Sequence, residues 1–167
     1  MEYIKLGASD LTVSRICLGC MGFGDPDAGQ HSWTVGEDDT REIVKHALDV
    51  GINFFDTAIA YQGGTSERYV GRALRDFARR DDVVVATKFL PRTADEIADG
   101  VSGQAHIMNS IDASLSHLGM DYVDLYIYHM WDYNTPLHDV MEGLAQVVAA
   151  GKARYVGIAN VYAWQLE

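Results

Sequence analysis

The chain has 167 residues, of which 48% are hydrophobic and 22% charged, an ordinary composition for a soluble globular domain. Its formal net charge is −11. Such an acidic chain is repelled by phosphate backbones and anionic membrane surfaces, which argues against nucleic acid and membranes as partners. Residues 1–5 lack the basic and then apolar stretch of a secretory signal, so we expect a cytoplasmic protein with one domain over residues 1–167.

Two cysteines, Cys17 and Cys20, form a C-x-x-C pair. Cys17 lies inside the apolar run Ile16–Leu18, which is typical of a buried strand rather than of a helix start. Packing therefore explains Cys17 better than a thioredoxin-like motif, and we expect both thiols to be reduced. The six histidines show no metal-ligand spacing, so no metal is expected.

Short apolar runs alternate with amphipathic helices after an expected hairpin at residues 3–14. The runs predict strands at Ile16–Gly19, Asn53–Asp56, Val83–Thr87, Tyr122–Tyr128 and Arg154–Ile158. Helical spacing predicts helices between these strands, over residues 37–51, 66–77, 107–119 and 136–151. Ser66 and Thr135 are expected to cap two of these helices, and Phe77 is expected on an inner face. The order predicts an α/β fold with parallel strands.

Polar side chains stand at the predicted ends of four successive strands: Asp56, Lys88, His129 and Asn160. Tyr61 follows five residues after Asp56, in the loop above the same strand. Because parallel α/β proteins bind ligands at the carboxyl ends of their strands, these side chains are expected to share one edge.

The residue types at this edge suit proton donation to an oxygen atom. Tyrosine is a weak acid, with a reference pKa of about 10, and a neighbouring ammonium favours its phenolate. Lys88 can supply the ammonium, Asp56 can hold Lys88 in place, and His129 can orient a carbonyl oxygen beside Tyr61. The set therefore predicts a site where oxygen becomes alkoxide as hydride reaches carbon.

Each residue also has a structural explanation. Asp56 could cap a loop, Lys88 could be a solvated charge, His129 a core histidine and Tyr61 a half-buried aromatic. Their coincidence at one edge favours the functional interpretation. Trp131, just after His129, fits a substrate wall and a packing role about equally well.

Several segments match a known family in order along the chain. They are NFFDTA at 53–58 with Tyr61, GGTSERYVGRAL at 63–74, ATK at 86–88, SLSHLGMDYVDLY at 114–126 with His129, and GKARYVGIAN at 151–160. These segments resemble the aldo-keto reductase family, and the LGCMGFG opening at 18–24 is most similar to bacterial members related to potassium-channel β subunits.

The resemblance implies NADPH-dependent reduction of a small carbonyl compound. It makes Asp56, Tyr61, Lys88 and His129 a catalytic tetrad, with Tyr61 as general acid. It also implies cofactor contacts from Met21, Gly22, Phe23, Asp56, Ala159 and Asn160. Two positions depart from the family pattern: Ala159 stands where serine is usual, and Gln62 stands where many members have glycine.

The family fold is a (β/α)₈ barrel, which needs about 250 residues. This sequence supplies about five β/α units behind a β-hairpin, so the resemblance implies a domain truncated at its C-terminus, without the later loops that hold the cofactor phosphates. A truncated product, a proteolytic fragment and an incomplete expressed chain all stay open. The alternatives to an enzyme are a non-catalytic NADPH-sensing interaction protein and a half-barrel that self-associates or binds a complementing chain.

Overall fold

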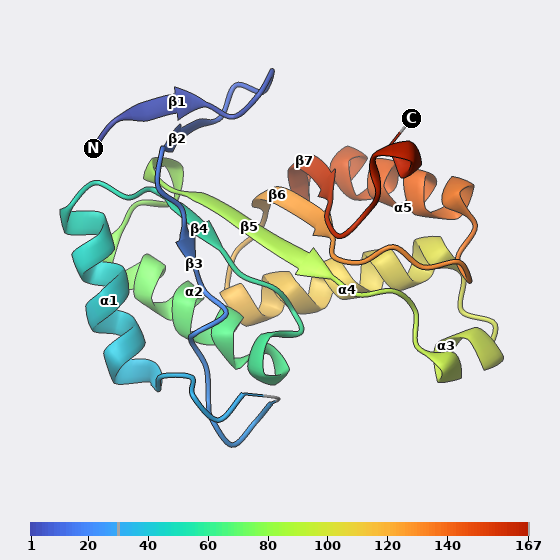
Figure 1. The fold of residues 1–167 in the computed structure, drawn as a ribbon, viewed down its shortest axis with the longest axis horizontal. Coiled ribbons are helices and arrows are strands. Elements are labelled where there is room, and N and C mark those ends of the chain that lie inside the picture. Colours follow the sequence, from blue (N-terminus) through green and yellow to red (C-terminus); the bar gives the residue numbers. More distant parts are fainter. Residues whose placement is uncertain (30, 167) are drawn as a thin grey trace.

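The structure is a computed structural model that describes residues 1–29 and 31–166, a β-hairpin followed by alternating strands and helices (Figure 1). The hairpin pairs β1 (Tyr3–Lys5) with β2 (Thr12–Ser14), as predicted. Its turn is closed by Ser9, whose Oγ donates to the Leu6 carbonyl at 2.6 Å. The hairpin lies at the amino-terminal end of the sheet, away from the edge where ligands are expected (Figure 1).

Five parallel strands form one sheet, and their spatial order is their order along the chain. They are β3 (Leu18–Gly19), β4 (Phe54–Asp56), β5 (Val84–Phe89), β6 (Val123–Tyr128) and β7 (Ala153–Ile158). All five point the same way, so their carboxyl ends meet at one edge. The prediction of an α/β fold with a parallel sheet is confirmed.

Helices connect successive strands and cover the outer face of the sheet (Figure 1). The four long helices are α1 (Glu37–Asp49), α2 (Thr65–Phe77), α4 (Gly103–Leu118) and α5 (Leu137–Ala149). Single 3₁₀ turns lie at Tyr61–Gly64, Arg80–Asp82 and Ala163–Gln165. In the described part of the chain, no helix is long and apolar enough to cross a membrane.

A short helix, α3 (Ala94–Ala98), was not predicted, although its sequence carries a start signal. Thr93 Oγ1 accepts from the Glu96 amide while the Glu96 carboxylate accepts from the Thr93 amide, which is a capping box. Five residues are too few for an apolar stripe to reveal a helix by its period.

The main core lies between the sheet and the four long helices. Its fully buried members include Phe55 of β4, Val70 of α2, Val85 of β5, Ile111 of α4 and Val147 of α5. A second, smaller cluster of Leu11, Val13 and Val84 lies under the hairpin. The sheet edge that carries the polar residues is thus held rigidly from behind by close-packed side chains.

The strand expected at Ile16–Gly19 begins two residues later, and Ile16 and Cys17 are exposed rather than buried. Only Leu18 and Gly19 pair with β4. Because β3 is at the edge of the described sheet, no second strand covers the residues before it. The cysteine that does pack in the core is Cys20, and both cysteines are free thiols, as expected.

Three helix assignments also needed correction. Gly64, not Ser66, precedes α2 as its cap residue, and Ser66 is buried in the first turn. Phe77 is the last residue of α2 and is 38% exposed rather than buried on an inner face. The guanidinium of Arg41 lies over its ring, 4.9 Å from the ring centre. Pro136 precedes α5 in place of Thr135, since its fixed φ suits the residue before a helix.

Candidate active site

Lys88 lies at the centre of the polar edge and is buried, 7% exposed. Its Nζ lies 2.9 Å from Asp56 Oδ2, 3.1 Å from the Tyr61 hydroxyl and 2.8 Å from the Thr57 carbonyl oxygen. An ammonium has three N–H donors and no acceptor, so all three donors are used. The Tyr61 oxygen must therefore accept from Lys88, and its own proton is free to be donated elsewhere.

Each partner of Lys88 is placed by the local fold. Asp56 is the last residue of β4, and Thr57 continues the ladder, because its amide donates to the Ala86 carbonyl at 2.9 Å. Tyr61 begins a 3₁₀ turn, with its amide donating to the Ala58 carbonyl at 3.1 Å. Lys88 itself lies within β5, one residue before the strand ends. The sequence predicted this grouping but not Thr57.

Ser66 fixes Thr57 from behind. The hydroxyls of these two residues lie 3.0 Å apart, and Ser66 Oγ donates to the Cys20 carbonyl at 2.8 Å. All of these atoms are buried. The first turn of α2 is thereby bonded to the loops that follow β3 and β4, which keeps the Thr57 carbonyl aimed at Lys88.

A buried carboxylate supports β5 at the residue that precedes Lys88. Glu67, fully buried on α2, accepts from Thr87 Oγ1 at 2.6 Å and lies 2.8 Å from His117 Nδ1. His117 lies on α4, so this bond joins α4 to α2. This contact lies behind the sheet, so it orders β5 and does not reach the polar edge.

His129 follows β6 and faces Tyr61, with ring centres 5.8 Å apart in an edge-on arrangement. Its amide donates to the Phe89 carbonyl at 2.9 Å, which aligns it with the end of β5. Burial, reinforced by the Lys88 charge, lowers the pKa of His129 below the ordinary value, with Asp56 opposing this in part. The imidazole is therefore neutral at pH 7.

Two buried ring nitrogens near this edge have no hydrogen-bond partner among the described residues: His129 Nδ1 and Trp131 Nε1. Trp131 is half-buried two residues beyond His129, and its ring stands edge-on to Tyr133 at 6.4 Å. Buried donors are usually paired, so an unpaired indole N–H beside a polar edge fits the substrate position expected for Trp131.

The residues expected at the cofactor are only partly brought together. Asn160 joins the site directly, because its Nδ2 donates to the His129 carbonyl at 2.7 Å, and the Ala159 amide donates to the Tyr128 carbonyl. Met21 is 43% exposed. It follows Cys20, whose amide donates to the Asp56 carbonyl at 2.8 Å.

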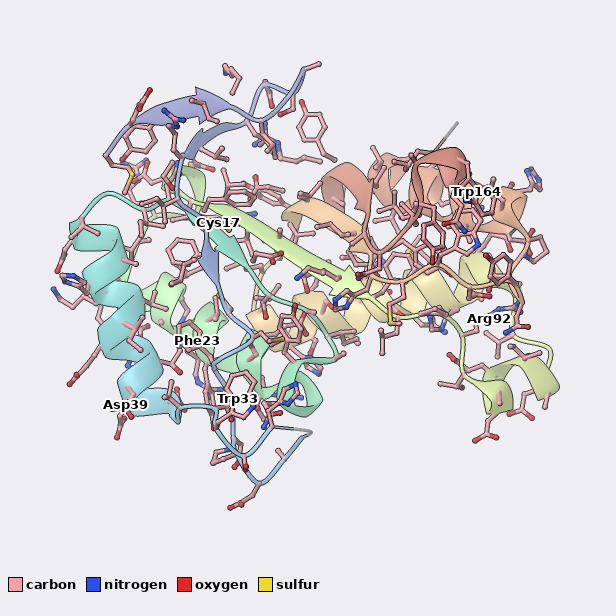
Figure 2. The ribbon with its side chains drawn as sticks, viewed as in Figure 1. Cys17, Phe23, Trp33, Asp39, Arg92 and Trp164 are labelled. Atoms are coloured by element: carbon pink, nitrogen blue, oxygen red, sulfur yellow. The ribbon has the colours of Figure 1, made fainter. Side chains whose placement is uncertain are left out.

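Phe23 differs from the other expected cofactor residues, because its side chain is 5% exposed and packs in the main core. Figure 2 labels Phe23 on the loop that follows β3. Only its backbone can face the polar edge. Gly22, one residue earlier, has no side chain, and an added Cβ would meet only the Trp33 ring at 3.9 Å.

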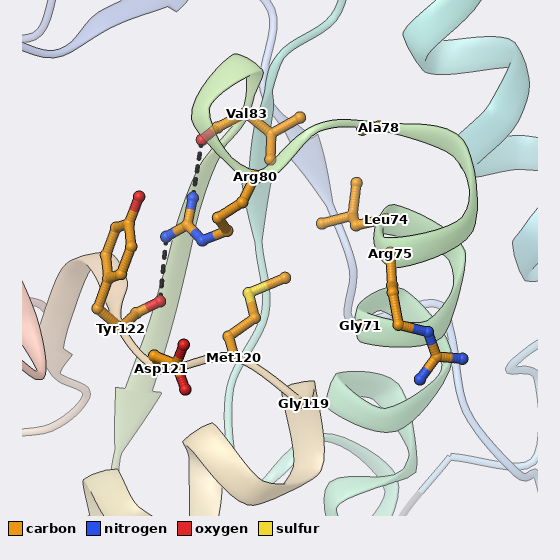
Figure 3. A pocket seen from close by; sticks show the side chains of 10 residues that line it. All are labelled: Gly71, Leu74, Arg75, Ala78, Arg80, Val83, Gly119, Met120, Asp121 and Tyr122. Atoms are coloured by element: carbon orange, nitrogen blue, oxygen red, sulfur yellow. Dashed lines mark hydrogen bonds between the residues drawn. The ribbon is translucent and has the colours of Figure 1, made fainter.

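A cavity of about 250 Å³ lies elsewhere, between the C-terminal ends of α2 and α4 (Figure 3). It adjoins Val83 and Tyr122, which precede β5 and β6, so it opens at the opposite edge of the sheet. Arg80 at its wall donates to the Val83 and Tyr122 carbonyls, both at 3.0 Å, and stacks on the Tyr122 ring. These bonds are structural, and we assign the chemistry to the edge around Lys88.

Fold and geometry together define a β/α protein with a cluster of polar side chains around Lys88 at the carboxyl edge of its sheet. The profile of the Aldo/keto reductase family matches residues 15–167, and the chain belongs to that family. The resemblance noted in the sequence is thus confirmed.

Individual relatives agree with this assignment. The chain is 35% identical to a versiconal hemiacetal acetate reductase of Aspergillus parasiticus, covering all of this chain and 53% of the relative. It is 33% identical to the aldo-keto reductase YhdN of Bacillus subtilis, covering all of this chain and 49% of that one. A crystal structure of a thermostable aldo-keto reductase with the inhibitor epalrestat superposes with a TM-score of 0.82 at 29% identity, over 98% of this chain and 56% of that one.

The chain therefore spans about half the length of the relatives it matches. The expected fold class, a β/α barrel represented here by about five β/α units, is confirmed by the structural match.

Proposed function

We propose that this chain carries the hydride-transfer site of an NADPH-dependent carbonyl reductase, with Tyr61 as the general acid. Family membership and reductase-named relatives support an oxidoreductase that acts on carbonyl compounds. The observation that carries the finer proposal is the Lys88 ammonium, whose three donors end on Asp56, Tyr61 and Thr57.

The proton step follows from that geometry. The substrate oxygen accepts the Tyr61 proton, and the Lys88 ammonium, 3.1 Å away, stabilises the phenolate left behind. Asp56, which is partly exposed, holds the Lys88 ammonium in position through the 2.9 Å contact between its Oδ2 and Lys88 Nζ. Tyr61, Lys88 and Asp56 thus allow the Tyr61 oxygen to donate its proton and to take one back in the reverse step.

His129 is the second donor to the carbonyl oxygen in this proposal. A buried N–H without an acceptor is rarer than a buried lone pair without a donor, so the unpaired Nδ1 favours the tautomer with hydrogen on Nε2. Nε2–H is then available to orient the carbonyl oxygen, and neutrality at this position avoids a second positive charge beside Lys88.

The described residues fit the nicotinamide end of NADPH, because the exposed side-chain amide of Asn160 lies at the sheet edge that also holds Tyr61. Asn160 and Ala159 would contact the nicotinamide amide, while Met21, Gly22 and the Phe23 backbone would face it from the loop after β3. When bound, NADPH supplies the hydride. The chain's part is to hold the carbonyl carbon toward that donor and to exclude water with Trp131.

The test is an assay of NADPH oxidation by the purified chain with a panel of aliphatic and aromatic aldehydes. We expect a carbonyl-dependent fall in NADPH absorbance that Tyr61→Phe abolishes. NADPH binding without oxidation for any aldehyde would instead support a non-catalytic cofactor-sensing protein.

A half-barrel that acts by binding a complementing chain is the second candidate. The observation in its favour is the exposed C-terminal segment, where Tyr162 and Trp164 stack together while 69% and 65% exposed. Absence of both NADPH oxidation and NADPH binding would support this candidate.

A further inference from the structure

Gln62, directly after Tyr61, is a fully enclosed side chain on a strained backbone. It is 2% exposed, and its φ and ψ of 48° and 49° lie in the left-handed region. Glycine and asparagine adopt that region readily, whereas glutamine does so only where its surroundings hold it. The side chain therefore needs an explanation.

The Gln62 amide is bonded to both ends of one loop. Its Nε2 donates to the Asp25 carbonyl at 2.8 Å and to the His31 carbonyl at 2.9 Å, with Thr34 Oγ1 at 3.2 Å. Its Oε1 accepts from the His31 amide at 3.0 Å. A single side chain thus bonds to backbone groups of Asp25 and His31, on the two sides of this loop.

The loop is shaped to fit Gln62. A Cβ on Gly24 would lie 2.5 Å from Gln62 Cβ, and one on Gly29 would lie 2.5 Å from Gln62 Cα. Glycine at both positions lets the loop approach this closely. Thr65 adds to the junction, because its Oγ1 accepts from the Asp25 amide at 2.9 Å and donates to the Gln62 carbonyl at 2.7 Å.

The loop held in this way carries an exposed aromatic pair. The His31 and Trp33 rings stack with centres 4.8 Å apart, and Trp33 is 58% exposed. The Trp33 ring lies beside Gly22, as the 3.9 Å approach to that residue's added Cβ shows. Figure 2 labels Trp33 on this loop, next to Phe23.

We propose that Gln62 is a positioning residue that ties the loop of residues 24–34 to the Tyr61 segment and thereby holds Trp33 as a flat wall for ring-bearing carbonyl substrates. The tether follows from the hydrogen bonds alone. The substrate part rests on the proposed carbonyl reduction, with Trp33 offering an aromatic face on which a planar ring can stack.

Hydrogen exchange tests the tether without any need for catalysis. Gln62→Gly keeps the left-handed backbone without strain but removes all the side-chain bonds. Gln62→Glu keeps the size but sets an oxygen against the Asp25 and His31 carbonyls. In both variants we expect amides of the 25–34 segment to exchange about tenfold faster or more, because their opening costs less.

The matched control is Gln146→Glu, which adds the same charge at an exposed position of α5. It should leave exchange in the 25–34 segment unchanged. If Gln62→Gly and Gln62→Glu also exchange at the original rate, Gln62 does not hold the loop and the tether is overturned.

Kinetics test the wall. With naphthalene-2-carbaldehyde we expect Gln62→Gly to raise KM about tenfold and to leave kcat within about twofold of the parent value. The variant loses binding energy that the substrate and the transition state share, whereas the proton step is unaffected. Hexanal should show no such change, and Trp33→Ala should reproduce the same selectivity. An equal rise in KM for both aldehydes would overturn the wall. If the chain oxidises no NADPH with any carbonyl compound, the proposed function is refuted. The hydrogen-exchange rates of the 25–34 segment then still show whether Gln62 holds the loop.

Discussion

Lys88 is the residue on which the proposed chemistry depends, because its ammonium bonds to three acceptors from the end of β4 and the loop that follows it. Tyr61→Phe removes the proton donor but keeps the ring, so we expect turnover to fall by about 10²–10⁴-fold, the usual contribution of general acid catalysis. Lys88→Met should be comparably harmful, since the phenolate loses its stabilising charge. Steady-state rates of NADPH oxidation give both values.

The circular dichroism spectrum of each variant provides the control for folding. Turnover that survives Tyr61→Phe unchanged would remove Tyr61 from the mechanism.

Cys17 combines exposure with low reactivity. Partial desolvation of its thiol raises the pKa to about 12, with the Asp56 charge adding to the effect. Thiolate is the reactive form, so at pH 8 we expect Cys17 to be alkylated more slowly than an ordinary thiol. Cys20, which is fully buried, should also resist.

Mass spectrometry after timed iodoacetamide treatment measures the alkylation rates, and urea-unfolded chain supplies the fast reference. Rapid labelling of either cysteine in the folded chain, or a disulfide between them, would contradict the expectation.

His129 makes stability depend on pH in a defined direction. Its pKa in the folded chain is lowered by burial, whereas the unfolded chain has the ordinary value of about 6.5. Between these two values the unfolded state binds more protons, so the free energy of unfolding falls as pH drops through that window. His129→Gln, which cannot titrate, should lose less stability between pH 7.5 and pH 5.5.

Urea unfolding of both proteins at the two pH values gives the comparison, and other titrating groups cancel in the difference. Equal losses in the two proteins would show that His129 is not perturbed.

At the scale of elements, hydrophobic period predicted the four long helices and the parallel strands between them, because each strand and helix contributes a face to one core. The errors fall where a neighbour decides the outcome. Ile16 and Cys17 are apolar but have no second strand beside them, and Phe77 has the right spacing but lies under Arg41 at the helix end.

The candidate site was predictable for a similar reason and to a similar extent. Asp56, Lys88 and His129 follow or end strands, and strand ends meet at one edge in any parallel sheet. Thr57 acts through its backbone carbonyl, which carries no sequence signal. Gln62 bonds to residues about thirty positions away, and no local pattern encodes that partner.

Gly71 sets the distance between α2 and α4. A Cβ at this position would lie 2.1 Å from the Leu118 carbonyl oxygen, which is backbone and cannot swing aside. Gly71→Ala should therefore separate the helices and lower the free energy of unfolding by about 1–3 kcal/mol, the usual range for overpacking.

Gly157→Ala on β7 is the matched control, because its added Cβ would meet side chains at 3.6 Å and 3.7 Å, an ordinary contact. Urea denaturation should leave this control close to the parent. Equal stability of the two variants would mean that the α2–α4 contact tolerates a methyl group.

For the whole molecule, we expect the 167-residue chain to self-associate. Within the described sheet, β3 and β7 each pair on one side only, and Val156 of β7 is 39% exposed. Unpaired strand edges favour pairing with other chains. Sedimentation velocity should show species larger than a monomer, and Val156→Lys should shift the distribution toward the monomer. We also expect NADPH binding weaker than that of a full barrel, measurable by fluorescence titration.

A monodisperse monomer that binds NADPH at micromolar concentration or below would contradict both expectations. Val148→Lys, at an equally exposed position of α5, controls for the added positive charge.

The strand order of the sheet has a consequence for synthesis on the ribosome. Each strand from β4 to β7 pairs with the strand made just before it, so every new β/α unit meets a partner that has already emerged. Growth of the sheet can then be vectorial, with short loops to close at each step. The Lys88–Tyr61 contact can form once β5 emerges, before His129 has been translated, so the proton donor is assembled ahead of the group that orients its substrate.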